Sequence, residues 1–164
     1  MTGIIDVNNQ TVLHETYIRT CYRLAEQAVA HGNHPFGALL VHDGKIILTA
    51  ENTVATDRDV TAHAEMNLVR AANHAFTPEI LSECTLYTST EPCAMCSGAI
   101  YWQMFRRVVF GCSSARLTEI AGGGLPISCR EIFAHGTEPT EVIGPVLEEE
   151  GLAVHERFWK SSQL

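Results

Sequence analysis

The sequence predicts an α/β protein in which a mixed β-sheet is flanked by helices, and two patterns carry this prediction. β-rich runs at 36–41 and 46–52 are separated by a turn that contains Asp-Gly. Asp-Gly is a strong short-range signal for a hairpin, so these two runs should pair antiparallel. Farther along, a strand at 84–89, a helix at 93–103 and a strand at 107–111 form a strand-helix-strand unit, whose two strands should lie parallel.

The other elements follow from the spacing of apolar residues along the chain. Residues 11–31 place apolar side chains at helical intervals and are followed by Gly32, which is typical of an amphipathic helix. Residues 62–73 contain neither glycine nor proline and follow Asp59 and Thr61, which can cap a helix. Beyond these elements we expect a flexible loop at 121–124, a short helix at 128–134, an edge strand at 140–146 and a final helix at 148–161.

Length and composition indicate a single domain spanning residues 1–164, because 164 residues with 46% hydrophobic content can bury one sizeable core. No apolar run approaches the roughly 20 residues that a membrane helix needs. Residues 1–10 carry neither the basic nor the apolar region of a secretory signal, so we expect a cytoplasmic protein. With 19 acidic and 11 basic residues, the formal net charge of -8 disfavours nucleic acid as a partner.

The strongest functional signal is a histidine and a glutamate, His63 and Glu65, followed by the pair Cys93 and Cys96. One imidazole and two thiolates supply three zinc ligands, and three protein ligands leave a tetrahedral ion one open position. An open position is typical of a catalytic zinc ion with bound water or hydroxide. A carboxylate such as Glu65 can take a proton from this water and return it to the substrate.

The positions of these residues in the predicted helices constrain where the metal lies. Side chains two residues apart on a helix point about 200° apart, so His63 and Glu65 cannot both face a metal beside the helix wall. We therefore expect the zinc ion beyond the N-terminal ends of two helices, one beginning near His63 and the other near Cys93. The positive ends of the two helix dipoles then favour the cysteines as thiolates.

Four of the six cysteines lie outside this motif, and a small buried apolar role is the first interpretation for each of them. Cys84 begins a strand that ends near Cys93, so it lies too far away to close the zinc site. Cys112 follows the parallel strand. A structural zinc ion closed by Cys112 therefore stays open as an alternative, as does a protein without a metal.

Several segments resemble one known family of zinc enzymes. They are Asn-His-Pro-Phe-Gly-Ala at 33–38, Thr-Ala-His-Ala-Glu at 61–65, Leu-Tyr-Thr-Ser at 86–89 and Glu-Pro-Cys-Ala-Met-Cys at 91–96. His-x-Glu followed by Pro-Cys-x-x-Cys is the signature of zinc deaminases. The chain thus resembles the cytidine deaminase-like superfamily, in particular its branch of guanine deaminases and tRNA adenosine deaminases. Residues 96–102, Cys-Ser-Gly-Ala-Ile-Tyr-Trp, are closer to guanine deaminases.

The resemblance implies a three-layer α/β/α fold with a mixed five-stranded sheet, and a homodimer with one catalytic Zn2+ per subunit. It also implies hydrolytic deamination, in which zinc-activated water attacks the ring carbon that bears an amine, Glu65 carries protons and ammonia leaves. The resemblance implies His63, Cys93 and Cys96 as zinc ligands and Glu65 as proton carrier. It also implies that Asn52 and the backbone of Ala64 contact the substrate. Phe36 and Trp102 are rings that could stack on the base, and core packing is the alternative for both.

We expect the substrate to be a small nucleobase or nucleoside, with a guanine-like purine or a related aminated heterocycle favoured. Residues 121–130 do not match the acidic stretch that guanine deaminases carry after the corresponding strand, so a second assisting carboxylate has no clear counterpart there. Glu119, Glu131 and Glu141 are the alternatives for this role, and a solvated surface position is the first interpretation for each. The alternatives are deamination of a tRNA wobble adenosine, deamination of a cytosine-type pyrimidine, and a non-catalytic binding module with a structural zinc ion. The pair Phe158 and Trp159 is similar to family tails that help to close the active site, with docking of the last helix as the alternative.

Overall fold

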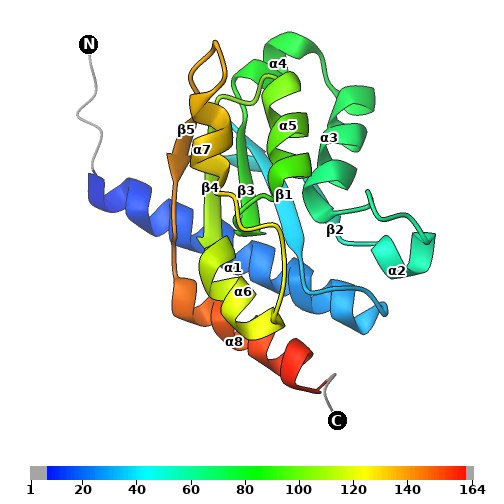
Figure 1. Cartoon of the computed structure of the whole chain (residues 1–164). Helices are drawn as coiled ribbons and strands as arrows, with labels where there is room; N and C mark the ends of the chain where they lie inside the picture. Colours follow the sequence, from blue (N-terminus) through cyan, green and yellow to red (C-terminus); the bar gives the residue numbers. More distant parts are fainter. Residues whose placement is uncertain (1–6, 162–164) are drawn as a thin grey trace.

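The structure, a computed structural model, describes residues 7–161 (Figure 1). Residues 1–6, which belong to the segment where no secretory signal is expected, lie outside the described residues. Five strands form one sheet in the order β2-β1-β3-β4-β5. Their bounds are Gly37–His42 for β1, Lys45–Glu51 for β2, Thr85–Thr90 for β3, Arg107–Cys112 for β4 and Glu141–Ile143 for β5.

Both strand orientations occur in this sheet. β1 pairs antiparallel with β2 through a tight hairpin, in which Asp43 and Gly44 adopt positive φ angles of 49° and 68°. β1 also pairs antiparallel with β3, whereas β3 with β4 and β4 with β5 are parallel. The predicted mixed sheet, the hairpin and the parallel strand-helix-strand unit are therefore confirmed.

Helices α1 (Val7–Ala30) and α8 (Glu148–Ser161) pack on one face of the sheet (Figure 1). Ile18, Cys21 and Ala25 of α1 recur every three or four residues and are fully buried in the core on this face. This spacing is the apolar stripe of an amphipathic helix, and it explains why the first helix lies along the sheet.

Helices α3 (Ala64–Ala75), α5 (Ala94–Trp102) and α7 (Cys129–Ala134) lie on the opposite face (Figure 1). Because neighbouring residues of a strand point to opposite faces, Leu39 contributes to the core under α1 and Leu40 to the core under α3 and α5. The sheet thus lies between two helical layers, as the sequence predicts. No helix among the described residues is both long and apolar enough to cross a membrane.

Three short helices complete the described chain, and no pattern in the sequence predicts them. They are α2 (Val54–Asp57), α4 (Pro78–Ser82) and α6 (Ser114–Ala121). No residue of α6 is buried, so this helix has no strong apolar stripe to reveal it. Its end signals are nevertheless present: the Ser113 side chain accepts a hydrogen bond from a first-turn N–H, and Gly122 ends the helix with a φ of 74°.

Most predicted boundaries differ from the structure by about one residue, the first helix begins at Val7 rather than at residue 11, and α6 includes the first residue of the loop expected at 121–124. Two further differences have a clear physical reason. The helix expected at 62–73 begins at Ala64, because His63 keeps an extended backbone and is the N-cap residue. The expected caps Asp59 and Thr61 bond to each other instead, with the Thr61 hydroxyl donating to Asp59 Oδ1 at 2.7 Å. The edge strand expected at 140–146 is shorter and comprises only Glu141–Ile143, the three residues that pair with β4.

Gly37 allows α1 to approach β1 closely. A Cβ atom at this position would lie 2.5 Å from Cβ of Leu24 and 2.6 Å from the carbonyl oxygen of Cys21, both on α1. Only glycine therefore fits here without moving the helix. The close contact positions the start of β1, the strand that directly follows Phe36.

Candidate metal centre and active site

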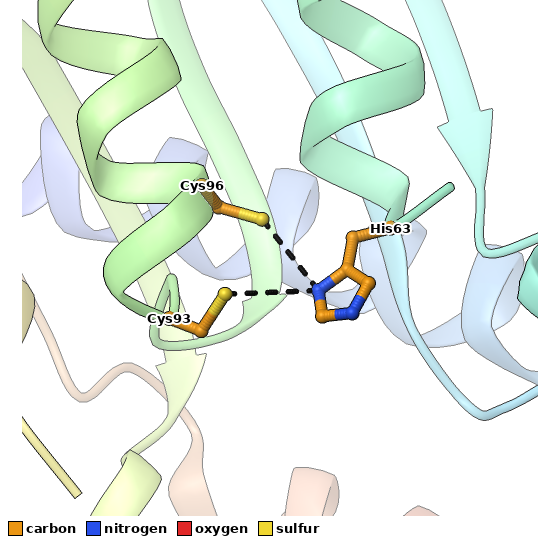
Figure 2. Close-up of side chains that lie close together, drawn as sticks. All are labelled: His63, Cys93 and Cys96. Carbon is orange, nitrogen blue, oxygen red and sulfur yellow. Dashed lines mark hydrogen bonds between the residues drawn. The ribbon is translucent and has the colours of Figure 1, made fainter. Parts of the chain in front are cut away.

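Two helix N-termini lie side by side and bring three metal-ligating side chains together (Figure 2). His63 is the N-cap residue of α3, Cys93 is the N-cap residue of α5, and Cys96 lies in the first turn of α5. The Sγ atoms of Cys93 and Cys96 lie 3.7 and 3.6 Å from Nδ1 of His63. All three ligand atoms lie within 4.8 Å of one another. The side chains converge beyond the two helix ends, where the sequence places the metal.

The donor atoms fit a tetrahedral zinc ion. With Zn–S and Zn–N bonds of about 2.3 and 2.0 Å, a tetrahedral ion holds sulfur and nitrogen about 3.5 Å apart. The observed separations of 3.6 and 3.7 Å lie close to this value. Among the residues that the structure describes, no fourth His, Cys, Asp or Glu joins the cluster, so the donor set is that of a catalytic rather than a structural site.

The surroundings of the cluster favour deprotonated sulfur. Hydrogen bonds from Cys96 and from His63 lower the pKa of Cys93 to about 4. The contact with Cys93 raises the pKa of Cys96, so one thiolate forms first and a bound cation is needed to keep the second. Both cysteines lie at the N-terminal end of α5, where the helix dipole adds further positive potential.

Glu65 stands in the first turn of α3 with its carboxylate buried beside the sulfur atoms, and the residue is only 5% exposed. Thr88 of β3 donates a hydrogen bond of 2.7 Å to Oε1, whereas Oε2 lies 3.5 Å from Sγ of Cys96. Burial raises the pKa of Glu65, and the hydrogen bond from Thr88 opposes this increase. One carboxylate oxygen is thus fixed by the sheet while the other faces the metal ligands, which suits proton transfer.

The structure separates the other cysteines from the metal ligands. Cys112 ends β4 beside Thr90, is fully buried, and donates from Sγ to the carbonyl oxygen of Ser113 at 3.5 Å. Cys84 precedes β3 and lies at the opposite end of this strand from the cluster. Neither belongs to the group of close ligand atoms, so a structural zinc ion closed by Cys112 has no support within residues 7–161.

A cavity of about 150 Å³ lies beside the metal ligands. His63, Glu65 and Cys93 form part of its wall, together with the ring of Phe36 and with Thr90 at the end of β3. This volume is below the range of about 300–1,000 Å³ that is usual for drug-sized ligands, so the cavity suits a small molecule. Among residues 7–161, no lysine or arginine lines it.

Glu91 fixes the segment that covers this cavity. Its Oε2 accepts hydrogen bonds from the backbone N–H and the hydroxyl of Ser114, at 3.0 and 2.9 Å, and its Oε1 accepts the N–H of Cys129 at 3.0 Å. These two anchor residues begin α6 and α7. The segment between them contributes Leu117 and Leu125 to the cavity wall, so Glu91 holds both ends of a covering segment.

The structure brings only some of the predicted substrate contacts to the cavity. Phe36 lines it, whereas Asn52 and Ala64 are buried without lining it, and the backbone N–H of Asn52 donates to the carbonyl of Phe36. Trp102 is the last residue of α5, nine positions after Cys93 and hence about 13 Å farther along the helix. It is 83% exposed, so within one chain it contacts neither the cavity nor the core.

The aromatic pair near the C-terminus lies outside the cavity lining. Phe158 and Trp159 pack on the ring of His34, with centroid distances of 5.8 and 5.7 Å. The last helix reaches the cavity wall through His155 instead, whose Nε2 lies 2.8 Å from Oγ1 of Thr90.

Sequence reasoning missed four polar residues of the site: Thr88, Thr90, Glu91 and His155. The two threonines lie two positions apart on β3, and Glu91 follows this strand directly and precedes the Pro-Cys motif. The available signal was therefore two hydroxyls in a buried strand and a carboxylate just after it. His155 gave no such signal, because it meets Thr90 across 65 residues of sequence.

Comparison with known proteins agrees with this geometry. A model of the cytidine and deoxycytidylate deaminase zinc-binding region matches residues 11–112. A probable cytosine deaminase from Schizosaccharomyces pombe is 43% identical over 149 residues, which cover 87% of this chain and 90% of that protein. A guanine deaminase from Bacillus subtilis is 43% identical over 112 residues, or 68% of this chain and 70% of that protein.

Solved structures show the same architecture. A structure from a study of A-to-I editing by tRNA:A34 deaminases superposes with a TM-score of 0.72 at 30% identity, covering 85% of this chain and 98% of that chain. The family model spans both halves of the metal-ligand cluster as well as Glu65. The chain therefore belongs to the family of cytidine and deoxycytidylate deaminase zinc-binding proteins, and it is a zinc-binding deaminase that hydrolyses C–N bonds.

Proposed function

We propose that the protein catalyses the hydrolytic deamination of a small amino-substituted nucleobase or nucleoside, with release of ammonia. The observation that carries this proposal is the position of Glu65. This buried carboxylate has one oxygen turned toward zinc-type ligands and lines a cavity of about 150 Å³. Hydrolysis of a C–N bond needs an activated water and a group that carries protons to the leaving amine. We assign zinc binding to His63, Cys93 and Cys96, and proton transfer to Glu65.

The proposed mechanism divides the work among a few side chains. Zinc, when bound, supplies a water molecule that is acidic enough to act as a nucleophile at neutral pH. Glu65 takes up a first proton from the attacking water at Oε2 and delivers it to a ring nitrogen of the base. It then takes a second proton from the hydroxyl added to the ring carbon and delivers it to the amine, which leaves as ammonia as the C–N bond breaks, while Thr88 holds Oε1 in place. Phe36 presents an aromatic face on which a planar heterocycle can stack. Asn52 and the backbone at Ala64 remain the proposed polar contacts to the base.

A free base or nucleoside is favoured over a nucleic acid. The cavity is small, no lysine or arginine of the described part of the chain lines it, and a net charge of -8 opposes the approach of a polyanion. A guanine-like purine is the first candidate, because residues 96–102 are closer to guanine deaminases. Cytosine is the second candidate, favoured by the 43% identity to a probable cytosine deaminase over 149 residues.

A panel of substrates tests this proposal. Ammonia release is measured for guanine, guanosine, adenine, adenosine, cytosine, cytidine and ammeline-type triazines, with a tRNA anticodon stem-loop alongside. We expect turnover of at least one free base or nucleoside. Turnover of the stem-loop alone would contradict the proposal, and a zinc-loaded protein that deaminates nothing in the panel would point to a non-catalytic binding module.

The variant Glu65→Gln tests the assigned proton carrier. Glutamine keeps the size of the side chain and can still accept the hydrogen bond from Thr88, but it cannot take up a proton. We expect ammonia release to fall by about 10²–10⁴-fold, the usual contribution of general acid–base catalysis, at unchanged zinc content. A variant that retains activity would remove Glu65 from this role.

We further propose a homodimer, in which the exposed end of α5 contacts the partner. Trp102 and Met104 are 83% and 54% exposed, and large apolar side chains in water favour association. Light scattering at one fixed concentration should give a dimer for the wild type and a monomer for Trp102→Glu. Val12→Glu, at an apolar position of α1 that is 59% exposed, serves as a control that keeps the dimer.

A further inference from the structure

His155 of α8 lies directly behind the wall of the substrate cavity. The residue is 1% exposed, and its ring contacts the ring of Phe36 at a centroid distance of 5.4 Å. Its Nε2 lies 2.8 Å from Oγ1 of Thr90. Both Thr90 and Phe36 line the cavity, so His155 touches two wall residues without lining the cavity itself. The proposed mechanism assigns this histidine no role.

The environment of His155 determines which ring nitrogen carries the proton. Burial lowers the pKa of His155 to about 4, so the imidazole is neutral near pH 7 and has a single N–H. Nδ1 is buried and has no hydrogen-bond partner among the described residues. A buried N–H without an acceptor is rarer and more costly than a buried acceptor without a donor. The proton therefore belongs on Nε2, where it is donated to Oγ1 of Thr90.

This tautomer determines what the Thr90 hydroxyl can do. A hydroxyl has one proton and accepts through its lone pairs, and the bond from His155 uses a lone pair. No other protein atom among the described residues bonds to Oγ1 of Thr90, which leaves the hydroxyl proton without a protein acceptor. Since Thr90 lines the cavity, this proton points to whatever the cavity holds.

We infer that Thr90 donates a hydrogen bond to an acceptor atom of the substrate, and that His155 is the positioning residue that fixes this donor direction. The inference rests on the proposed deaminase function and narrows its substrate class. The substrate presents a carbonyl oxygen or an unprotonated ring nitrogen toward the end of β3, next to its stacking contact with Phe36. A group that can only donate would leave this hydroxyl proton without an acceptor, and could use only the second lone pair of Oγ1.

Two substitutions at Thr90 separate the hydroxyl from the shape of the side chain. Thr90→Val keeps the branched shape and removes the donor, whereas Thr90→Ser keeps the donor. With the substrate found in the panel, we expect Thr90→Val to raise KM about tenfold, as the loss of one hydrogen bond does, with a smaller change in kcat. Thr90→Ser should restore most of this loss. Equal KM values for the two variants, at equal zinc content and Tm, would overturn the inference.

Substrate analogues identify the acceptor. 2-Aminopurine lacks the oxo group of guanine, and 4-aminopyrimidine lacks that of cytosine. If the carbonyl oxygen is the acceptor, Thr90→Val weakens binding of the oxo compound about tenfold and leaves binding of the analogue unchanged. If a ring nitrogen is the acceptor, Thr90→Val weakens binding of the oxo compound and of its analogue by the same factor. If the oxo compound and its analogue both bind the wild type and Thr90→Val with equal affinity, Thr90 donates no hydrogen bond to the substrate.

Two substitutions at His155 test the positioning role. The amide nitrogen of glutamine reaches about as far as Nε2, whereas that of asparagine reaches only about as far as Nδ1. We expect His155→Gln to stay within about threefold of the wild-type KM and His155→Asn to raise KM about tenfold. If His155 had only a structural role, the KM values of the two variants would follow their Tm values and not the reach of the amide nitrogen.

A direct measurement of the tautomer is independent of activity. Nitrogen-15 NMR of the zinc-loaded protein with labelled histidine should show the Nε2–H form for the signal that disappears in His155→Gln. An Nδ1–H form would overturn the inference even if the protein is an active deaminase. Conversely, a protein that deaminates nothing in the panel but shows the Nε2–H form would refute the proposed function and leave the donor direction of Thr90 intact.

Discussion

Thr88 shows at the scale of a single residue how the sheet controls the proposed catalytic carboxylate. Its hydroxyl is fully buried and donates to Oε1 of Glu65 at 2.7 Å. A hydrogen bond to a charged group contributes about 1.5–3 kcal/mol. We expect Thr88→Val to lower kcat about 10–100-fold, because the carboxylate loses its fixed direction. Steady-state kinetics with zinc analysis checks this.

Thr88→Ser is the matched control for this prediction, since serine keeps the donor and loses only a methyl group. It should retain most of the wild-type kcat. A fully zinc-loaded Thr88→Val enzyme with wild-type kcat would mean that Glu65 needs no anchor on β3.

His155 also makes the stability of the protein depend on pH. Burial lowers its pKa in the folded protein to about 4, against about 6.5 in an unfolded chain. Between these values the unfolded chain binds a proton that the folded protein excludes, so acidification favours unfolding. The contribution of neutral His155 to the free energy of unfolding is fully present above about pH 6.5, and about 3 kcal/mol of it is lost as the pH falls through 4.

Urea unfolding of the zinc-loaded protein between pH 4 and 7 measures this effect. The wild type should lose more stability across this window than His155→Gln, which cannot take up the proton. Protonation of the zinc ligands acts on both proteins and cancels in the difference. Parallel pH profiles for the two proteins would show that His155 does not titrate in this range.

At the scale of elements, Glu91 joins the end of β3 to α6 and α7. Its carboxylate accepts three hydrogen bonds from Ser114 and Cys129, which fix both ends of the segment over the cavity. Glutamine at this position has one acceptor oxygen instead of two, so Glu91→Gln keeps one anchor and loses the other. We expect amide hydrogen exchange in residues 122–128 to become at least tenfold faster, and KM to rise with little change in zinc content.

The control for this prediction is Glu119→Gln, which removes a charge from an exposed position of α6 without touching either anchor. Its exchange rates should match those of the wild type. Unchanged exchange in Glu91→Gln would mean that packing of Leu117 and Leu125, and not the carboxylate, holds the covering segment.

For the whole molecule, removal of zinc should abolish activity without unfolding the chain. The metal ligands join only the N-terminal ends of α3 and α5. Neither His63 nor Cys93 belongs to the hydrophobic core on either side of the sheet. We therefore expect a chelator to stop ammonia release and lower Tm by several degrees, with cooperative unfolding retained. Addition of zinc should restore both.

Circular dichroism during chelation checks this expectation. A far-ultraviolet spectrum that collapses on chelation would show that the metal holds the fold together, as in small structural zinc domains.

How much of the molecule was predictable depended on how far apart the interacting residues lie in sequence. The hairpin, the strand-helix-strand unit and the metal motif rest on local spacing, and each lies where the sequence places it. The contacts that shape the cavity join Thr90 to His155 and Glu91 to Cys129, across 65 and 38 residues. No local pattern encodes such pairs, so sequence reasoning passed over them.

Trp102 is a different case. The family resemblance implies a ring that stacks on the base, but the helix after Cys96 carries Trp102 away from the cavity within one chain, and its side chain is 83% exposed. Proximity in sequence is a guide to proximity in space only where the direction of the intervening element is taken into account.

The two anchors of Glu91 divide the active site into parts that can be altered separately. The metal ligands and Glu65 lie at the N-terminal ends of α3 and α5, whereas Leu117 and Leu125 form part of the cavity wall from the segment between Ser114 and Cys129. The segment between Ser114 and Cys129 can therefore be replaced by other sequences without changing the metal ligands or Glu65. We expect such replacements to change which heterocycle binds in the cavity and to leave the residues that carry out hydrolysis unchanged.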